Sequence, residues 1–171
     1  MNPEEFFSFD PETGEWRNKA TNYRFVFLGE PFYVNMIINL TKQFGSAAGV
    51  FIYQSGLGIG LEMGKLLMSA PDPLMGIRML FRHIFTAGWG EMKLEKEDTD
   101  LLFSDAPVTI LESNGFYSYL SQREGMEHLK PFVKGVITGM FDFIREKEHT
   151  CEMEIISEEP LECRYIVQPL G

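Results

Sequence analysis

The sequence predicts a single domain of the α+β class with an antiparallel sheet. The chain has 171 residues, which is close to the usual size of one domain. Helical and strand-like patterns occur in blocks along it and do not alternate, which is typical of α+β proteins. The chain also closes with two strand-like segments on either side of a short polar turn, the pattern of an antiparallel hairpin.

Residues 1–21 predict an irregular leader that precedes one domain over residues 22–171. The leader contains three turn-favouring pairs, Asn2-Pro3, Asp10-Pro11 and Thr13-Gly14, and shows no sustained periodicity. We expect it to lie against the domain without regular secondary structure.

Two kinds of periodicity define the elements of the domain. Apolar residues spaced three and four apart predict helices, and Pro31, Pro73 and Pro131 suit the first turns of three of them. Alternation, or a run of aromatic and β-branched residues, predicts strands. The expected elements are, in chain order, a strand over 23–28, helices over 32–44, 47–68 and 72–88, strands over 92–94 and 107–111, helices over 114–125 and 129–145, and strands over 150–156 and 161–167.

Two of the expected helices carry glycines at a spacing of four residues. These are Gly56, Gly60 and Gly64 in one helix and Gly135 and Gly139 in the other. Each glycine in a helix interior costs about 1 kcal/mol relative to alanine, so five of them need a packing reason. Residues four apart share one helix face, and we predict that the two helices cross closely through their glycine faces. Separate contacts with other elements are the alternative.

The composition argues against several classes of function. The formal net charge is -10, and both nucleic acid and anionic membranes repel such a chain. The N-terminus is acidic where a signal peptide needs positive charge, and no uninterrupted apolar run approaches the roughly 18 residues of a membrane span. We therefore expect a cytoplasmic protein without stable membrane insertion. Fifteen Phe and ten Met supply bulky apolar surface for a core or a pocket.

No motif in the sequence identifies a reaction. The glycine-rich run over 56–60 is followed by Leu61 where a dinucleotide-binding turn needs glycine, and it lacks the Gly-Lys-Ser/Thr of a phosphate loop. A G-x-S-x-G nucleophile motif is absent. His83 lies in an apolar helix and is expected to be a partly buried structural side chain, whereas His128 and His149 are expected at the surface. We assign no catalytic residue.

The closing hairpin contains residue types that zinc accepts, among them Cys151, Cys163, Glu152 and Glu154. Strand alternation places Cys151 on the face opposite to the two glutamates. The centre of the hairpin places Cys151 opposite residue 167 and away from Cys163. We therefore expect neither a metal site nor a disulfide, and predict two buried free cysteines.

Four segments together resemble the 4-vinyl reductase domain family, over about residues 30–168. Each is degenerate, but their order and spacing match the family pattern. The segments are Gly45–Gly64 with Tyr53-x-x-Gly56-x-x-x-Gly60, Glu112-Ser113-Asn114-Gly115-Phe116, Pro131-Phe132-Val133 with Gly135 and Gly139, and Glu154-x-x-Ser157 with Cys163-Arg164-Tyr165.

The resemblance implies a fold shared with TRAPP transport-particle subunits and nitric-oxide-signalling haem domains, in which helices pack on one side of a twisted antiparallel sheet. It also implies dimers that enclose an apolar pocket for small hydrophobic molecules. Several relatives bind zinc through two hairpin cysteines, a glutamate and a helix cysteine. Here Val133 and Ser157 replace two of these ligands. Only Glu154 and Cys163 remain as remnants, so we expect no zinc and no other cofactor.

We hypothesise a homodimeric, non-catalytic domain that binds a hydrophobic small molecule or hydrocarbon in a sensory or carrier role. A scaffold or tethering subunit that uses the same fold as an interaction module is the alternative. A tetrapyrrole-related reductase accessory protein ranks last, because neither a redox-cofactor motif nor an acid–base pair is visible. Six residues are candidates for the pocket lining because of the apolar segments in which they lie: Tyr53, Met79, His83, Phe85, Trp89 and Phe116.

Overall fold

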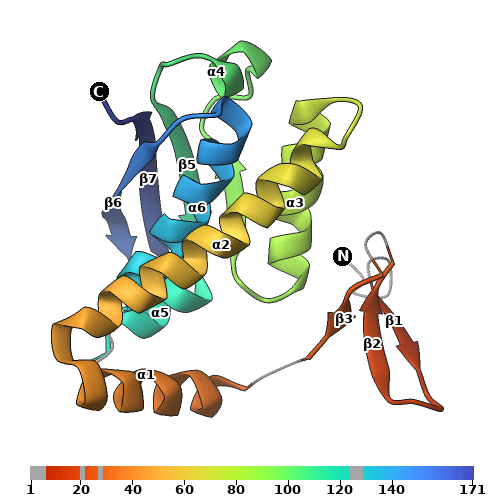
Figure 1. The fold of residues 1–171 in the computed structure, drawn as a ribbon, viewed down its shortest axis with the longest axis vertical. Coiled ribbons are helices and arrows are strands. Elements are labelled where there is room, and N and C mark those ends of the chain that lie inside the picture. Colours follow the sequence, from red (N-terminus) through yellow and green to blue (C-terminus); the bar gives the residue numbers. More distant parts are fainter. Residues whose placement is uncertain (1–6, 20–21, 27–28, 124–128) are drawn as a thin grey trace.

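The computed structural model describes residues 7–19, 22–26, 29–123 and 129–171, and they form the α+β fold that the sequence predicts (Figure 1). Most of the strands and helices lie close to where the periodicity places them. In chain order they are β1 (Phe7–Asp10), β2 (Glu15–Asn18), β3 (Arg24–Phe25), α1 (Glu30–Phe44), η2 (Gly45–Ala47), α2 (Ala48–Met68), α3 (Pro73–Thr86), β4 (Glu91–Leu94), α4 (Thr99–Phe103), β5 (Val108–Ser113), α5 (Phe116–Ser121), α6 (Lys130–Arg145), β6 (His149–Glu158) and β7 (Leu161–Pro169).

The central sheet is antiparallel and has the strand order β4-β5-β7-β6. In Figure 1, α6 lies against this sheet and α2 crosses α6 on the side away from it. Burial alternates along β5, where Val108, Ile110 and Glu112 are buried and the residues between them are half-buried. The core therefore lies between the sheet and the layer formed by α6 and α2.

The crossing of α2 and α6 confirms the predicted contact between glycine faces. A Cβ atom on Gly60 would overlap the carbonyl oxygen of Val136 and lie only 2.8 Å from the backbone nitrogen of Met140. A Cβ on Gly139 would overlap the carbonyl oxygen of Leu57. Gly56 and Gly135 face the opposite backbone in the same way. The glycines at four-residue spacing thus allow the two helix backbones to touch.

The closing hairpin has the register that the sequence predicts. Cys151 lies opposite Val167, and Cys163 lies opposite Ile155. Both cysteines are buried and free, and burial raises the pKa of Cys151 to about 12 and that of Cys163 to about 11. Both thiols therefore stay protonated and unreactive at neutral pH.

Glu154 and Cys163, which the resemblance matches to zinc ligands of other proteins, do not converge. Glu154 is exposed beside Arg164, whereas Cys163 is buried in the core. Among the described residues, no three His, Cys, Asp or Glu side chains are placed to share a metal ion. The absence of a cofactor stays a prediction.

The prediction of an irregular N-terminal leader is wrong for residues 7–18, which form the β1–β2 hairpin. β3 pairs with β2 and completes a small three-stranded sheet. The turn signals around Asp10 and Gly14 belong to the hairpin turn itself, where the Asp10 carboxylate accepts hydrogen bonds from Thr13 and from the Glu12 amide. Strands of four residues are too short to show a clear periodicity. Residues 1–6 lie outside the described part of the chain.

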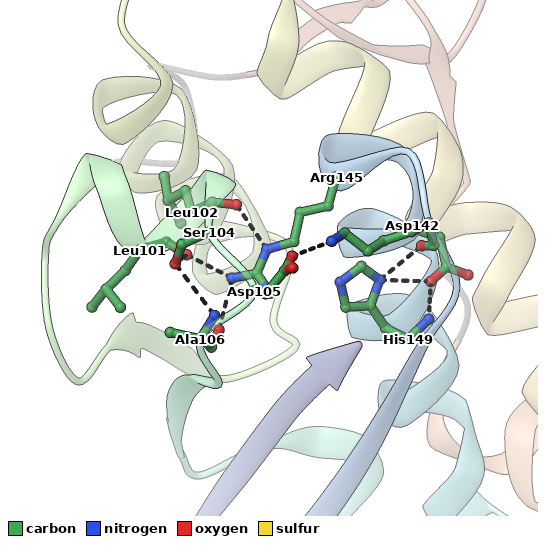
Figure 2. A network of polar contacts seen from close by, with 9 residues as sticks. Leu101, Leu102, Ser104, Asp105, Ala106, Asp142, Arg145 and His149 are labelled. Atoms are coloured by element: carbon green, nitrogen blue, oxygen red, sulfur yellow. Dashed lines mark hydrogen bonds and ion pairs between the residues drawn. The ribbon is translucent and has the colours of Figure 1, made fainter. Parts of the chain in front are cut away.

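The segment between β4 and β5 contains the short helix α4, which the sequence analysis missed. Asp98 caps it by accepting a hydrogen bond from the amide of Asp100 at 2.9 Å. Arg145 at the end of α6 is buried and donates hydrogen bonds to three backbone carbonyls around α4, those of Leu101, Leu102 and Ala106 (Figure 2). This side chain links α4 and the turn after it to the end of α6.

The helices α1 and α2 contain a long apolar stretch. In the described residues, one helical stretch, Glu30–Met68, contains an 18-residue window with a mean hydropathy of 1.2, which suffices by length and composition to cross a membrane. Core helices of soluble proteins meet the same criterion. The chain changes direction at η2, where Gly45 has a φ of 56°, so α1 and α2 are not one straight helix (Figure 1). The expectation of no stable membrane insertion stays a prediction.

Candidate functional site

An apolar cavity of about 380 Å³ lies between α1, α2, α5 and α6. A volume of this size is at the lower end of the range of small-molecule sites. The side chains around it are aromatic or aliphatic apart from one serine, and none is charged. They are Tyr33, Met36, Ile37, Leu40, Phe44, Phe51, Ile52, Ser55, Tyr117, Leu129 and Phe132.

The cavity has a buried floor and an exposed rim. Ile37, Ile52 and Leu129 are at most 5% exposed and form part of the floor. Phe44 and Phe51 are 46% and 52% exposed, and their rings lie 5.1 Å apart. This pair lies on the exposed side of the cavity, where α1 and α2 meet.

An aromatic cluster centred on Tyr117 forms one wall of the cavity. The Tyr117 ring lies 4.3 Å from that of Phe132, 5.2 Å from Trp89 and 5.3 Å from Phe116. Tyr33 completes the cluster, with its ring 5.8 Å from Tyr117. Interlocked rings at these distances form a rigid apolar surface, so this wall is preorganised.

The cavity has few polar groups, which are the hydroxyls of two tyrosines and a serine. Burial, together with the neighbouring hydroxyl of Tyr33, raises the pKa of Tyr117 above its ordinary value, so this phenol stays neutral. Ser55 donates to the carbonyl of Phe51 at 2.8 Å. A bound molecule therefore meets neutral hydroxyl groups and no side-chain charge within this lining.

Five of the six predicted pocket residues have described side chains, and none of these five belongs to the lining of this cavity. Trp89 and Phe116 come nearest, since they pack on the lining residues Tyr117 and Tyr33. Tyr53 is half-buried in α2, and its carbonyl faces Gly135 at the helix crossing. Met79 is 50% exposed on α3.

His83 lies where the N-terminal sheet meets α3. Its ring is 5.3 Å from the ring of Phe7, and its Nδ1 lies 3.2 Å from Nδ2 of Asn18. Because an amide nitrogen only donates, Nδ1 accepts in this arrangement. Burial lowers the pKa of His83, which favours this neutral form. His83 thus has a structural contact with the segment that the sequence analysis treated as a leader. Phe85 lies in α3, but its side chain is outside the described structure.

The cavity residues that the sequence analysis missed lie mainly on α1 and the N-terminal half of α2. Tyr33, Ile37, Leu40 and Phe44 recur on α1 at intervals of three and four residues. That spacing shows a shared helix face, which is a usable signal. It does not show whether the face meets a filled core or a cavity.

A second missed feature is the burial of Glu112, whose carboxyl group lies beneath α5 and which the sequence indicated only as part of a family-like segment. Its Oε2 accepts hydrogen bonds from the hydroxyl of Tyr165 at 2.9 Å and from Ser118. A Cβ on Gly115 would overlap this carboxyl group, so a larger residue there would displace the Glu112 side chain. The alternation of β5 placed Glu112 on the same face as Val108 and Ile110, a signal that could have identified it.

Burial raises the pKa of Glu112 above its ordinary 4.5, although the hydrogen bonds from Ser118 and Tyr165 act in the opposite direction. The folded protein therefore holds this proton more tightly than the unfolded chain does. Protonated Glu112 therefore adds to the free energy of unfolding. This contribution is complete below pH 4.5 and is lost as the pH rises through the folded-state pKa of Glu112.

We expect Glu112→Gln, which cannot ionise, to remove this loss. Urea unfolding of the original chain and the variant between pH 4 and pH 8 measures it. The difference between their free energies of unfolding should shift in favour of the variant as the pH rises. A difference that is constant across this range would contradict the prediction.

The expectation that His149 lies at the surface is wrong, because its side chain is fully buried. Its Nδ1 lies 2.8 Å from the carbonyl of Lys147 and 3.1 Å from the Asp142 carboxylate (Figure 2). Both partners are acceptors, so Nδ1 carries the proton. The pair positions the start of β6 against α6. His128 lies outside the described residues.

Comparison with known proteins supports the fold. No protein-family model matches the chain, and neither does any curated protein sequence. The phenol-responsive sensory domain of the transcription activator PoxR, solved with phenol, matches with a TM-score of 0.70 at 16% identity, over 98% of this chain and 87% of that one. A vinyl-4-reductase family protein from Methanocaldococcus jannaschii matches with a TM-score of 0.57 at 14% identity, over 86% and 85% of the two chains. The chain therefore has the fold that the resemblance predicted.

Proposed function

We propose that this domain binds a small, neutral, apolar molecule, with an aromatic ring as the favoured shape, in the cavity between α1, α2, α5 and α6. The observation that carries the proposal is a preorganised aromatic wall around a cavity of about 380 Å³ with no charged side chain in its lining. The similarity in fold to a phenol-responsive sensory domain supports a sensory role.

The chemistry of the lining defines which molecules fit. Aromatic rings favour the faces and edges of another ring, and the hydroxyls of Tyr33 and Tyr117 can exchange a hydrogen bond with a single polar substituent. An anionic ligand would lose its hydration without gaining a cationic partner from this lining. The site should therefore bind the neutral molecules phenol and toluene more tightly than the benzoate anion.

We expect phenol and toluene to bind the purified chain, and benzoate at neutral pH to bind at least about tenfold more weakly. Isothermal titration calorimetry measures the three affinities. Leu40→Trp, which fills the half-buried part of the cavity, should lower the affinity for phenol by tenfold or more. Asn39→Trp changes the adjacent exposed residue and is the matched control.

These measurements can refute the proposal in two ways. If none of the three compounds binds, the cavity is not a site for small aromatic molecules. If Leu40→Trp and Asn39→Trp bind phenol equally well, phenol binds elsewhere on the chain.

A second candidate function, an interaction module, is favoured by apolar residues exposed along α1 and α2. Large exposed apolar patches mark interaction sites. Eight exposed apolar side chains lie along these two helices, with the exposed ion pair of Glu62 and Lys65 among them: Phe32, Met36, Phe44, Val50, Phe51, Ile59, Leu66 and Met68. We propose that a second copy of the chain covers this face, so that the domain is a homodimer and both functions coexist.

Sedimentation velocity tests the homodimer. We expect the original chain to sediment as a dimer and Val50→Glu, at a residue that is 61% exposed, to sediment as a monomer. Gln54→Glu adds the same charge one turn along α2 without removing apolar contact, and should remain a dimer. A monomeric original chain would contradict the proposal.

A further inference from the structure

Helix α5 lies between the apolar cavity and the buried carboxyl group of Glu112. Tyr117 and Ser118 are consecutive residues of this helix, so their side chains leave it in directions about 100° apart. Tyr117 lines the cavity, whereas Ser118 donates a hydrogen bond to the Glu112 carboxyl group. Both side chains are buried. α5 therefore connects the wall of the cavity to a polar group on the central sheet.

The position of α5 depends on contacts outside the helix. It has only six residues, Phe116–Ser121, and its N-cap residue Gly115 makes no side-chain cap hydrogen bond. Isolated helices shorter than about 12 residues are marginal in water, so tertiary contacts must fix this one. The rings of the aromatic wall fix one another. The hydrogen bond from Ser118 to Glu112 attaches the helix that carries the central ring, Tyr117, to the sheet.

The Glu112 carboxyl group is itself held in place. Its Oε2 also accepts a hydrogen bond from the hydroxyl of Tyr165 at 2.9 Å, and the hydroxyl oxygens of Tyr165 and Ser118 lie 2.9 Å apart. A Cβ atom on Gly115 would overlap the carboxyl oxygens, so this group lies directly against the start of α5. Glu112 and Tyr165 belong to the paired strands β5 and β7. The carboxyl group is thus a fixed, buried acceptor for α5.

Trp89 contacts both ends of this arrangement. Its carbonyl accepts a hydrogen bond from the amide of Phe116, the first residue of α5, at 2.9 Å. Its ring lies 5.2 Å from the ring of Tyr117. A shift of α5 against the sheet would therefore change the surroundings of the Trp89 indole, which makes its fluorescence a reporter of the position of α5.

We propose that Glu112 is a positioning residue for the ligand cavity: through its bond to Ser118 it holds α5 so that Tyr117 keeps its place in the aromatic wall. The inference rests on the proposed function, because it concerns the affinity of the same cavity. Glu112 is not part of the cavity lining and acts only through α5. Without this bond α5 can shift against the sheet, and the wall then presents a different shape to the ligand.

The test uses Trp16→Phe as the parent chain, because Trp16 and Trp89 are the two tryptophans of the protein. Ser118→Ala removes the donor of the hydrogen bond, and Glu112→Leu removes the acceptor. We expect each change to lower the affinity for phenol about tenfold in isothermal titration calorimetry and to shift the emission maximum of Trp89. Glu112→Gln keeps an acceptor oxygen and should restore both quantities to the values of the parent.

Ser121→Ala is the matched control, since it also removes a buried hydroxyl from α5. The Ser121 hydroxyl donates to the carbonyl of Ser118 at 2.8 Å, within the helix. Its removal should leave the phenol affinity and the Trp89 emission unchanged. If Ser118→Ala changes neither quantity, or if Ser121→Ala weakens binding as much as Ser118→Ala does, Glu112 is not a positioning residue.

Failure of this inference is distinguishable from failure of the proposed function. If the parent binds phenol and Ser118→Ala binds it equally well, the cavity remains a site and only the positioning role is wrong. If the parent does not bind phenol, the proposed function is wrong, and unchanged Trp89 emission in Ser118→Ala also overturns the role of Glu112. Should circular dichroism show that Glu112→Leu does not fold, Ser118→Ala, which leaves the bond from Tyr165 to Glu112 in place, decides the outcome alone.

Discussion

Gly60→Ala should destabilise the protein by more than about 3 kcal/mol, enough to unfold a marginally stable domain. The added methyl group would overlap the carbonyl oxygen of Val136 and lie 2.8 Å from the backbone nitrogen of Met140. Both obstacles are backbone atoms of α6, which cannot rotate away as a side chain can. The two central helices would have to separate, and the packing between them would be lost along their length.

Gly58→Ala is the matched control, two residues away on the same helix. Nothing lies within 4 Å of a Cβ atom at Gly58, so the substitution has only the effect of helix propensity. It should stabilise the chain by about 0.5–1 kcal/mol. Urea unfolding followed by circular dichroism measures both variants. If Gly60→Ala is as stable as Gly58→Ala, the close crossing of α2 and α6 is refuted.

Arg145→Met should be the second severe change, with a loss of about 3 kcal/mol. The substitution keeps most of the apolar stem but removes the donors to the carbonyls of Leu101, Leu102 and Ala106. Those carbonyls would then lack the partner that joins α4 to the end of α6. We expect the α4 segment to lose its protection in hydrogen exchange before the rest of the domain does.

Lys147→Met is the control for Arg145→Met, because Lys147 lies two residues away and donates to Asp105 in the turn after α4. Its partner, Asp105, is 76% exposed, so solvent replaces the lost interaction. Stability should hardly change. An equal loss for the two variants in urea unfolding would show that the three carbonyl contacts of Arg145 have no special role.

The sequence predicted the features that depend on residues close together along the chain. The spacing of Gly56 and Gly60 indicated a face free of side chains, and the closing hairpin indicated the partner of Cys151. Both were confirmed, because the regular backbone of a helix or strand converts sequence spacing directly into direction in space. The repeated glycines even predicted which two helices would meet.

The sequence predicted the site less well, because a cavity is formed by residues that are distant along the chain. Trp89 and Phe116 pack against the side of Tyr117 that faces away from the cavity. Nothing in their local sequence distinguishes such a position from one that lines the cavity. His149 was misplaced for a similar reason. Its polar neighbours in sequence suggested exposure, whereas Asp142 on the preceding helix provides the acceptor that makes its burial possible.

By itself, the sequence determined the α+β class, the helix crossing and the two buried cysteines, since each follows from backbone periodicity and local residue type. Only the tertiary structure decided that α1 and α2 surround an uncharged cavity, that residues 7–18 form part of a sheet beside His83, and that Glu112 is buried under α5. These features require side chains from separate elements to meet. Such contacts depend on how the helices and strands pack together, and the residue pattern within a single element does not determine them.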